Sequence, residues 1–427
     1  MQLKDIFYTQ RFLPLFITQF FGAFNDNLLK NAMIIMITYY LAIHEGINSQ
    51  VLVTIAAGLF ILPFFIFSSL AGQFADKYDR AKLARIIKLF EIIIMLLAAI
   101  GFIMHSAWFL IAVLFATGVH STFFGPIKYA LLPQHLYPNE LLLGNAYIEA
   151  GTFLAILMGT ISGGILILLN FGTYAVSIAL IIFAIIGYIA SRYIPIAPGP
   201  APQLHINYNI LVETIKIIKY SKENPRVFNS ILCISWFWFI GATFLTQFPS
   251  LVKNYLHTEA NVVTLFLTIF SLGIGIGALV CSKLLHGAIK SIYVPIASIV
   301  MSIFILDLCF AANNIIYFNL PALLSTQQFL HIATSWRILF DLLGISICGG
   351  IYIVPLYTIM QYSSNKNYLA RIIAANNIFN ALFMVGSAIL ILAMLRLNRT
   401  MYDIFLLIAA VNIMVAYFVR KELNNNH

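Results

Sequence analysis

The stretch YAVSIALIIFAIIGYIASRYI (Tyr174–Ile194) carries a single charged residue, Arg192, close to its end. About twenty consecutive apolar residues are enough for a helix to cross the hydrocarbon core of a bilayer. Strands of a membrane barrel would instead appear as runs of about ten alternating residues. The stretch therefore predicts a membrane-spanning helix, and Ile86–Met104 is a second run of the same kind.

The composition of the whole chain agrees with this interpretation. It is 61% hydrophobic and only 9% charged, whereas about a quarter of a soluble domain is charged. A chain of 427 residues could not hide so much apolar surface in one core. In lipid the backbone must satisfy its own hydrogen bonds, which favours an all-α integral membrane bundle. The net charge of +9 is attributed to basic loops, because no basic tract interleaved with aromatics indicates nucleic-acid binding.

Apolar runs divide the chain into about twelve predicted transmembrane helices. They cover roughly residues 12–42, 51–75, 83–104, 107–127, 141–169, 171–193, 226–252, 260–285, 291–313, 335–360, 371–395 and 401–420. With the N-terminus placed in the cytoplasm, only four of the 24 Lys and Arg residues fall outside: Lys253, Arg337, Arg396 and Arg399. Basic residues collect on cytoplasmic loops, so both termini are expected in the cytoplasm.

The longest cytoplasmic connection separates two groups of six spans. We therefore expect an N-terminal half (1–193), a linker (194–225) and a C-terminal half (226–427). The linker opens with Pro195, Pro198, Pro200 and Pro202, a run of prolines that is typical of an extended spacer. Its segment Tyr208–Tyr220 has apolar and basic positions at helical spacing and predicts a helix on the inner membrane face. Two halves of six helices are the architecture of major facilitator transporters.

The loop GQFADKYDRAK (Gly72–Lys82) resembles the signature loop of that superfamily, with Asp79 where the signature usually has glycine. The resemblance implies that an aspartate, Asp76, pairs with cations at neighbouring helix ends and latches one side of the transporter. Together with it, the basic residues Lys77, Arg80 and Lys82 are predicted to take part in gating. The alternative is a solvated basic loop that only sets topology.

The first span carries an unusual polar segment. Asn25, Asp26 and Lys30 would each be costly in lipid, so they are expected to face the bundle interior or a wet cavity and to contact substrate. Asp26 and Lys30 stand four residues apart, so an internal ion pair that holds helices together is the alternative.

Spans five and eleven contain a matching pair of polar residues, Asn145 with Glu149 and Asn376 with Asn380. Each pair lies one turn apart on one helix face, and all four are candidate substrate-binding residues. Glu149 is a candidate either for proton coupling or for binding a cationic headgroup. Lys128 follows Gly125-Pro126, which is expected to break or kink span four, and it is a candidate phosphate ligand or an interfacial anchor.

Other charged residues in the spans have competing interpretations. Lys88 and Glu91 are spaced to form a self-contained pair, and Asp341 is spaced to pair with Arg337. His120 is expected to be a core histidine.

The signals of an enzyme are missing. The chain has no phosphate-binding P-loop and no G-x-S-x-G elbow. His135 and Glu140 form only a near-match to the His-x4-Asp motif of glycerolipid acyltransferases. Four single cysteines inside apolar runs indicate neither a metal site nor a disulfide framework, and no cofactor is expected.

Five segments together resemble the lysophospholipid transporter family. They are QFFGAFNDNLLKNAM (Gln19–Met33), GQFADKYDRAKL (Gly72–Leu83), FFGPIKYALLPQHL (Phe123–Leu136), GNAYIEAGTFLAILMGT (Gly144–Thr160) and RIIAANNIFNAL (Arg371–Leu382). They are especially similar to the transporter domain fused to bifunctional acyl-acyl-carrier-protein synthetase/2-acylglycerophosphoethanolamine acyltransferases.

The resemblance implies a transporter that moves lysophospholipids, such as lysophosphatidylethanolamine, across the bacterial inner membrane by alternating access. It also implies re-acylation by a separate acyltransferase, and it makes Asp26 and Lys128 candidate headgroup or gating residues. The family places a basic residue in span seven, and Ser230–Pro249 has none. The alternatives are a carrier of another amphipathic molecule, such as a drug or siderophore, and a membrane-embedded acyltransferase.

Overall fold

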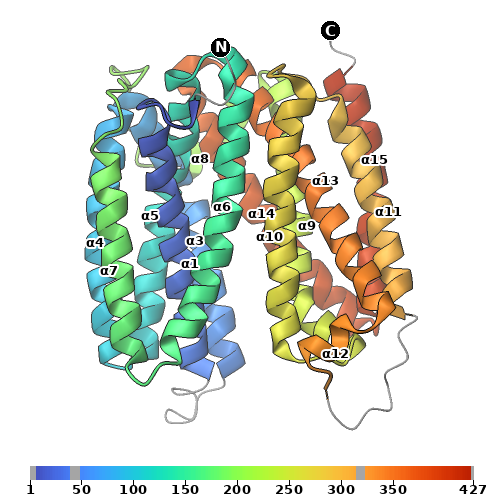
Figure 1. Cartoon of the computed structure of the whole chain (residues 1–427). Coiled ribbons are helices and arrows are strands. Elements are labelled where there is room, and N and C mark those ends of the chain that lie inside the picture. Colours follow the sequence, from blue (N-terminus) through green and yellow to red (C-terminus); the bar gives the residue numbers. More distant parts are fainter. Residues whose placement is uncertain (1–5, 39–48, 314–322, 425–427) are drawn as a thin grey trace. The chain divides into compact units, whose positions relative to one another are not determined.

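The computed structural model describes residues 6–38, 49–313 and 323–424, and these residues are almost entirely helical. The predicted end of the first span, residues 39–42, lies outside them. The long helices are α1 (Leu13–Met36), α3 (Ser49–Lys77), α4 (Arg80–Ile103), α5 (Ala107–His135), α6 (Pro138–Ile167), α7 (Gly172–Ser191), α9 (Pro225–Ser250), α10 (Ala260–Leu285), α11 (Tyr293–Asn313), α13 (Ala333–Ser363), α14 (Leu369–Arg396) and α15 (Met401–Asn424) (Figure 1). The short elements are α8 (Ile210–Lys222), α12 (Thr326–Leu330), the π-helix η3 (Leu251–Tyr255) and the 3₁₀-helix η4 (Lys366–Tyr368).

Eleven helices of the described chain are long and apolar enough to cross a membrane. The twelfth long helix, α1, has 24 residues and sufficient length, but it carries the polar segment from Asn25 to Asn31 and is not among the eleven. The predicted helical membrane bundle is confirmed, and the protein is a multi-pass membrane protein.

Helix α4 shows how such a bundle differs from a soluble one. Its charged residues Lys88 and Glu91 are buried, whereas Phe90 and Ile93 are exposed on the opposite face. Exposed apolar residues recur along that face at helical spacing, ending at Ile103. An exposed apolar stripe suits hydrocarbon, and buried charges avoid it.

The chain forms two compact units. The first contains residues 1–144, 154–225 and 361–381, and the second contains residues 145–153, 226–360 and 382–427. In the first unit α4 packs against α5 and α7, and α1 packs against α5 and α7, as neighbouring helices in Figure 1. In the second unit α11 packs against α15.

Small residues and buried amides hold each unit together. In the first unit a Cβ on Gly159 would lie 2.3 Å from the carbonyl oxygen of Phe24, and one on Gly163 would lie 2.5 Å from that of Leu28, so α6 and α1 touch through their backbones. In the second unit the Asn412 side chain of α15 accepts from Trp236 Nε1 at 3.0 Å and from Ser298 Oγ at 2.8 Å. It thereby links α15 to α9 and α11.

Of the break or kink predicted at Gly125-Pro126, the break is not found, and the kink stays a prediction. Helix α5 continues through Pro126 and Pro133 to His135, well past the predicted end of span four. A proline removes one backbone donor, but neighbouring helices can hold a transmembrane helix together around it. The predicted helix in the linker is present as α8, while residues 194–209 around the prolines are not helical.

Candidate functional site

Asp76, at the C-terminal end of α3, is completely buried and accepts four hydrogen bonds. Its Oδ1 accepts from Arg80 Nη2 at 3.2 Å and from the backbone nitrogen of Ala370 at 3.0 Å. Its Oδ2 accepts from the Nε and the backbone nitrogen of Arg371, at 2.9 and 3.3 Å. The carboxylate therefore joins the α3–α4 connection to the first turn of α14, where backbone amides and a helix dipole favour an anion.

The two arginines are held as firmly as the carboxylate. Arg80 also donates to the carbonyl oxygen of Ala75 at 2.9 Å and to Gln134 Oε1 at 2.9 Å. The Nη2 of Arg371 donates to the carbonyl oxygen of Asn367 at 3.1 Å. Both side chains are nearly buried, with 4% and 6% exposed. We call Asp76, Arg80 and Arg371 the latch. Sequence reasoning selected the first two and missed Arg371, although it begins the quoted segment RIIAANNIFNAL.

The other residues of the predicted gating loop have different surroundings. Asp79 caps α4 by accepting from the backbone nitrogen of Lys82 at 2.8 Å, and it accepts from that of Ala197 in the linker at 3.1 Å. This accounts for an aspartate where the superfamily signature has glycine. The ammonium of Lys77 lies 5.5 Å from the Tyr78 ring centroid, and the Lys82 side chain is exposed. Within the described chain neither lysine joins an ion pair, so their gating role stays a prediction.

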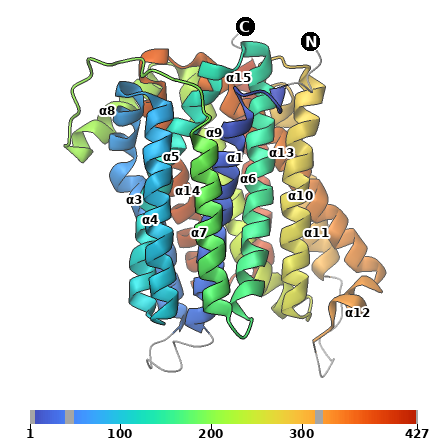
Figure 2. The ribbon, with the colours of Figure 1, turned by 60° about the vertical axis from the view of Figure 1, so that its left-hand side comes forward.

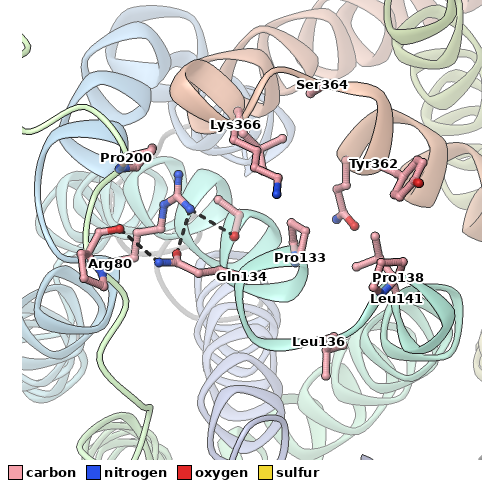
Figure 3. Close-up of a pocket in the computed structure, with 14 residues that line it drawn as sticks. Arg80, Pro133, Gln134, Leu136, Pro138, Leu141, Pro200, Tyr362, Ser364 and Lys366 are labelled. Carbon is pink, nitrogen blue, oxygen red and sulfur yellow. Dashed lines mark hydrogen bonds between the residues drawn. The ribbon is translucent and has the colours of Figure 1, made fainter.

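A cavity of about 410 Å³ lies beside the latch in the first unit. Its walls come from the end of α5, the start of α6, the proline segment of the linker and the connection from α13 to α14. Arg80 turns toward Gln134 at one side, and Lys366 points into the space (Figure 3). The Arg80 guanidinium already donates to Ala75, Gln134 and Asp76, whereas the Lys366 side chain is exposed and is positioned to meet an anion.

A second charged cluster is buried among α1, α4 and α5. Lys88 Nζ lies 2.5 Å from Glu91 Oε2, and His120 Nε2 lies 3.4 Å from the same oxygen. Asn25 Nδ2 donates to the carbonyl oxygen of Leu180 at 3.0 Å and lies 3.5 Å from Glu91 Oε1. The predicted pair of Lys88 and Glu91 is therefore present. It belongs to a wider cluster in which Asn25 also connects α1 to α7.

Lys88 reaches this position because two glycines leave room for it. A Cβ on Gly22 of α1 would lie 2.5 Å from Lys88 Nζ, and one on Gly187 of α7 would lie 3.8 Å from it. The ammonium also lies 4.9 Å from the ring centroid of Phe124.

Asp26 lies beside this cluster but does not use Lys30 as its hydrogen-bond partner. Its Oδ2 accepts from Ser121 Oγ of α5 at 2.6 Å, and its buried Oδ1 has no hydrogen-bond partner in the described chain. The Lys30 ammonium lies 5.5 Å from the ring centroid of Phe60. Both side chains are only partly buried. The two charges are thus near each other, and each keeps capacity for a further partner.

The remaining candidate residues are dispersed. Lys128 is partly buried, with its ammonium 4.7 Å from the Tyr129 ring centroid. Asn145 and Glu149 are buried in the second unit, where Asn145 Nδ2 donates to Thr358 Oγ1 at 3.2 Å. Asn376 and Asn380 lie in the part of α14 that belongs to the first unit. Asn376 is fully buried, and neither atom of its amide has a hydrogen-bond partner in the described chain.

Two further ion pairs join residues of different segments of the chain. Arg337 pairs with Asp307 of α11, not with Asp341 on its own helix. Glu140 binds Arg11 through both carboxylate oxygens, at 3.0 and 3.1 Å, and accepts from the backbone nitrogen of Tyr137 at 2.9 Å. The hydrogen bonds that Arg11 donates to Glu140 raise the pKa of the arginine. Glu140, the acidic residue of the near-match to the acyltransferase motif, thus caps the start of α6 and forms an ion pair with Arg11.

Comparison with known proteins shows the family of the chain. A family model described as the Major Facilitator Superfamily matches residues 15–389. The lysophospholipid transporter LplT of Klebsiella pneumoniae is 23% identical over 83% of this chain and 81% of its own length. The LplT of Yersinia enterocolitica is 28% identical over 42% of this chain and 40% of its own length.

Solved structures show the same fold. The human organic anion transporter MFSD10 (TETRAN) superposes with a TM-score of 0.73 at 11% identity, covering 95% of this chain and 98% of its own. The proton:xylose symporter XylE superposes with a TM-score of 0.70 at 10% identity, covering 96% and 95%.

Proposed function

The chain belongs to the major facilitator superfamily, and from this premise we propose that it transports lysophospholipids such as lysophosphatidylethanolamine across the bacterial inner membrane. The proposal draws its substrate class from relatives named lysophospholipid transporter that align over most of both chains. A secondary transporter of this superfamily works by alternating access around a site between its halves.

The structural observation that carries the proposal is the incomplete hydrogen bonding of the Asp26 carboxylate. One oxygen of its carboxylate is held by Ser121, while the other, Oδ1, has no hydrogen-bond partner in the described chain. A buried carboxylate oxygen without a hydrogen-bond partner is energetically unfavourable unless a ligand supplies a donor. The ammonium of an ethanolamine headgroup would supply that partner, and Lys30, on the same helix, would attract the phosphate.

The remaining candidates have subordinate roles in this proposal. Lys128 is a second phosphate ligand, and Asn25 positions α1 through its bonds to α4 and α7. Asn145, Glu149, Asn376 and Asn380 contribute polar contacts from α6 and α14 as the two helices move.

The latch closes the cytoplasmic side in this proposal. The charge distribution of the loops supports a cytoplasmic location for both termini, the linker and the latch. Exposed Leu211 and Ile215 of α8 then lie on the inner membrane surface beside the basic residues of the same helix. Lysophospholipid delivered to the inner leaflet is re-acylated by a separate acyltransferase.

Reconstitution tests the substrate class. Purified protein in liposomes should transfer labelled lysophosphatidylethanolamine between leaflets faster than protein-free liposomes, and it should discriminate against the two-chain phosphatidylethanolamine. Transfer of a drug or siderophore without transfer of the lysolipid would overturn the proposal and favour another amphipathic cargo.

A further inference from the structure

The linker helix α8 lies across the two helices that the latch joins. At its N-terminal side Asn207 and Gln73 of α3 exchange two hydrogen bonds: Gln73 Nε2 donates to the Asn207 carbonyl oxygen at 3.0 Å, and the Asn207 nitrogen donates to Gln73 Oε1 at 2.8 Å. In its middle Ile217 is buried in a cluster with Phe65 of α3 and Ala374 of α14. Figure 2 shows α8 beside α3.

The C-terminal side of α8 packs against Arg371 and its neighbour Tyr368. The ring of Tyr220 stacks on that of Tyr368 with centroids 4.7 Å apart. The guanidinium carbon of Arg371 lies 5.2 Å from the Tyr220 centroid and 5.8 Å from the Tyr368 centroid. Tyr368 also donates its hydroxyl hydrogen to Glu223 at 2.5 Å. Two aromatic rings therefore lie against the cation that binds Asp76.

We propose that Tyr220 is a positioning residue of the latch, so that the linker helix controls how firmly Arg371 is held on Asp76. An aromatic face attracts a guanidinium and limits its rotamers, which favours the geometry in which Nε meets the carboxylate. In the described chain Arg371 forms its ion pair with Asp76, donates to the Asn367 carbonyl oxygen and lies against the two rings. The inference rests on the latch role given under the proposed function.

The test measures the latch without any substrate. Ala374 is fully buried next to Gly72 of α3, where a Cβ on Gly72 would lie 2.9 Å from its own. A cysteine at Ala374 should react with a water-soluble thiol reagent only when α14 separates from α3. The native cysteines Cys233, Cys281, Cys309 and Cys348 are buried, and their reaction is measured in the protein without the added cysteine.

In the Ala374→Cys protein, Tyr220→Leu should raise the labelling rate roughly twofold to thirtyfold, the range of one cation–π contact. Tyr220→Phe keeps the ring and should restore the original rate. Tyr208→Leu is the matched control, because Tyr208 lies just before α8 and is 72% exposed. In an Arg371→Ala background, Tyr220→Leu should add little, because its effect passes through Arg371.

An unchanged rate in Tyr220→Leu, or an equal increase with and without Arg371, would overturn the inference. If Ala374→Cys alone disturbs the fold, the same comparison is made with limited proteolysis of the linker around Pro198–Pro202. Because no lysophospholipid is present, a failure here leaves the proposed substrate untouched, and a failure of lysophospholipid transfer leaves this result standing.

Discussion

Arg371 and Asp76 are 295 positions apart in the chain, yet the Nε of the first donates to the carboxylate of the second at 2.9 Å. The arginine comes from α14 in the C-terminal half of the sequence, and the aspartate comes from the end of α3. The arginine side chain is only 6% exposed and the carboxylate is fully buried, so each depends on the other for its stability.

Removal of the carboxylate should therefore open the latch and destabilise the protein. Asp76→Asn leaves the Arg80 and Arg371 guanidiniums buried without their anion, and breaking such a pair costs about 3–5 kcal/mol. Thermal unfolding of the purified protein in detergent measures this loss. Lys82→Gln is the control, since that lysine side chain is exposed and its change should stay within about 0.5 kcal/mol. Equal stability of Asp76→Asn and Lys82→Gln would show that the pair contributes nothing.

The Lys88–Glu91 pair should show non-additive mutations. Lys88→Met leaves the Glu91 carboxylate buried without the lysine ammonium, so the free energy of unfolding should fall by about 3–5 kcal/mol. The double variant Lys88→Met/Glu91→Gln removes both charges and should be more stable than Lys88→Met alone. The unfolding midpoints of the unmodified protein, Lys88→Met, Glu91→Gln and the double variant measure this dependence. Simple addition of the two single losses would mean that the two groups do not depend on each other.

The contact between α1 and α6 should tolerate no added methyl group. Gly159→Ala places a Cβ 2.3 Å from the carbonyl oxygen of Phe24, so the helices must separate, at a cost of about 1–3 kcal/mol. Gly58→Ala in α3 is the matched control, because a Cβ there has no neighbour within 4 Å. The unfolding temperature should fall only for Gly159→Ala. A fall of the same size for Gly58→Ala would indicate a general effect of losing glycine.

Much of the fold is predictable from the sequence because membrane helices must satisfy their own backbone. The predicted span 260–285 has the bounds of α10, and several others differ from the structure by a few residues. The predicted end of span four, at residue 127 directly after Gly125-Pro126, lies short of His135, where α5 ends. Whether a proline ends a helix depends on the helices packed around it, which local sequence does not reveal.

The site was predictable only where partners lie on one helix turn. The resemblance of the loop selected Asp76 and Arg80, helical spacing selected Lys88 with Glu91, and both pairs form. The same spacing suggested Asp341 with Arg337, but Arg337 binds Asp307 of another helix. Spacing permits a pair, and tertiary packing decides between competing partners. No local pattern could therefore reveal the contact between Asp76 and Arg371.

The most direct test of the account is inter-leaflet transfer of labelled lysophosphatidylethanolamine by Asp26→Asn in liposomes, beside the unmodified protein and Glu259→Gln. The control replaces an exposed glutamate at the start of α10, so it removes one carboxylate away from the buried cluster. Loss of a hydrogen bond to a charged group costs about 1.5–3 kcal/mol, so Asp26→Asn should slow transfer about tenfold or more. Glu259→Gln should transfer the lipid at the unmodified rate. Transfer at the unmodified rate by folded Asp26→Asn would contradict the account, because the headgroup would not need the carboxylate on which the proposal rests.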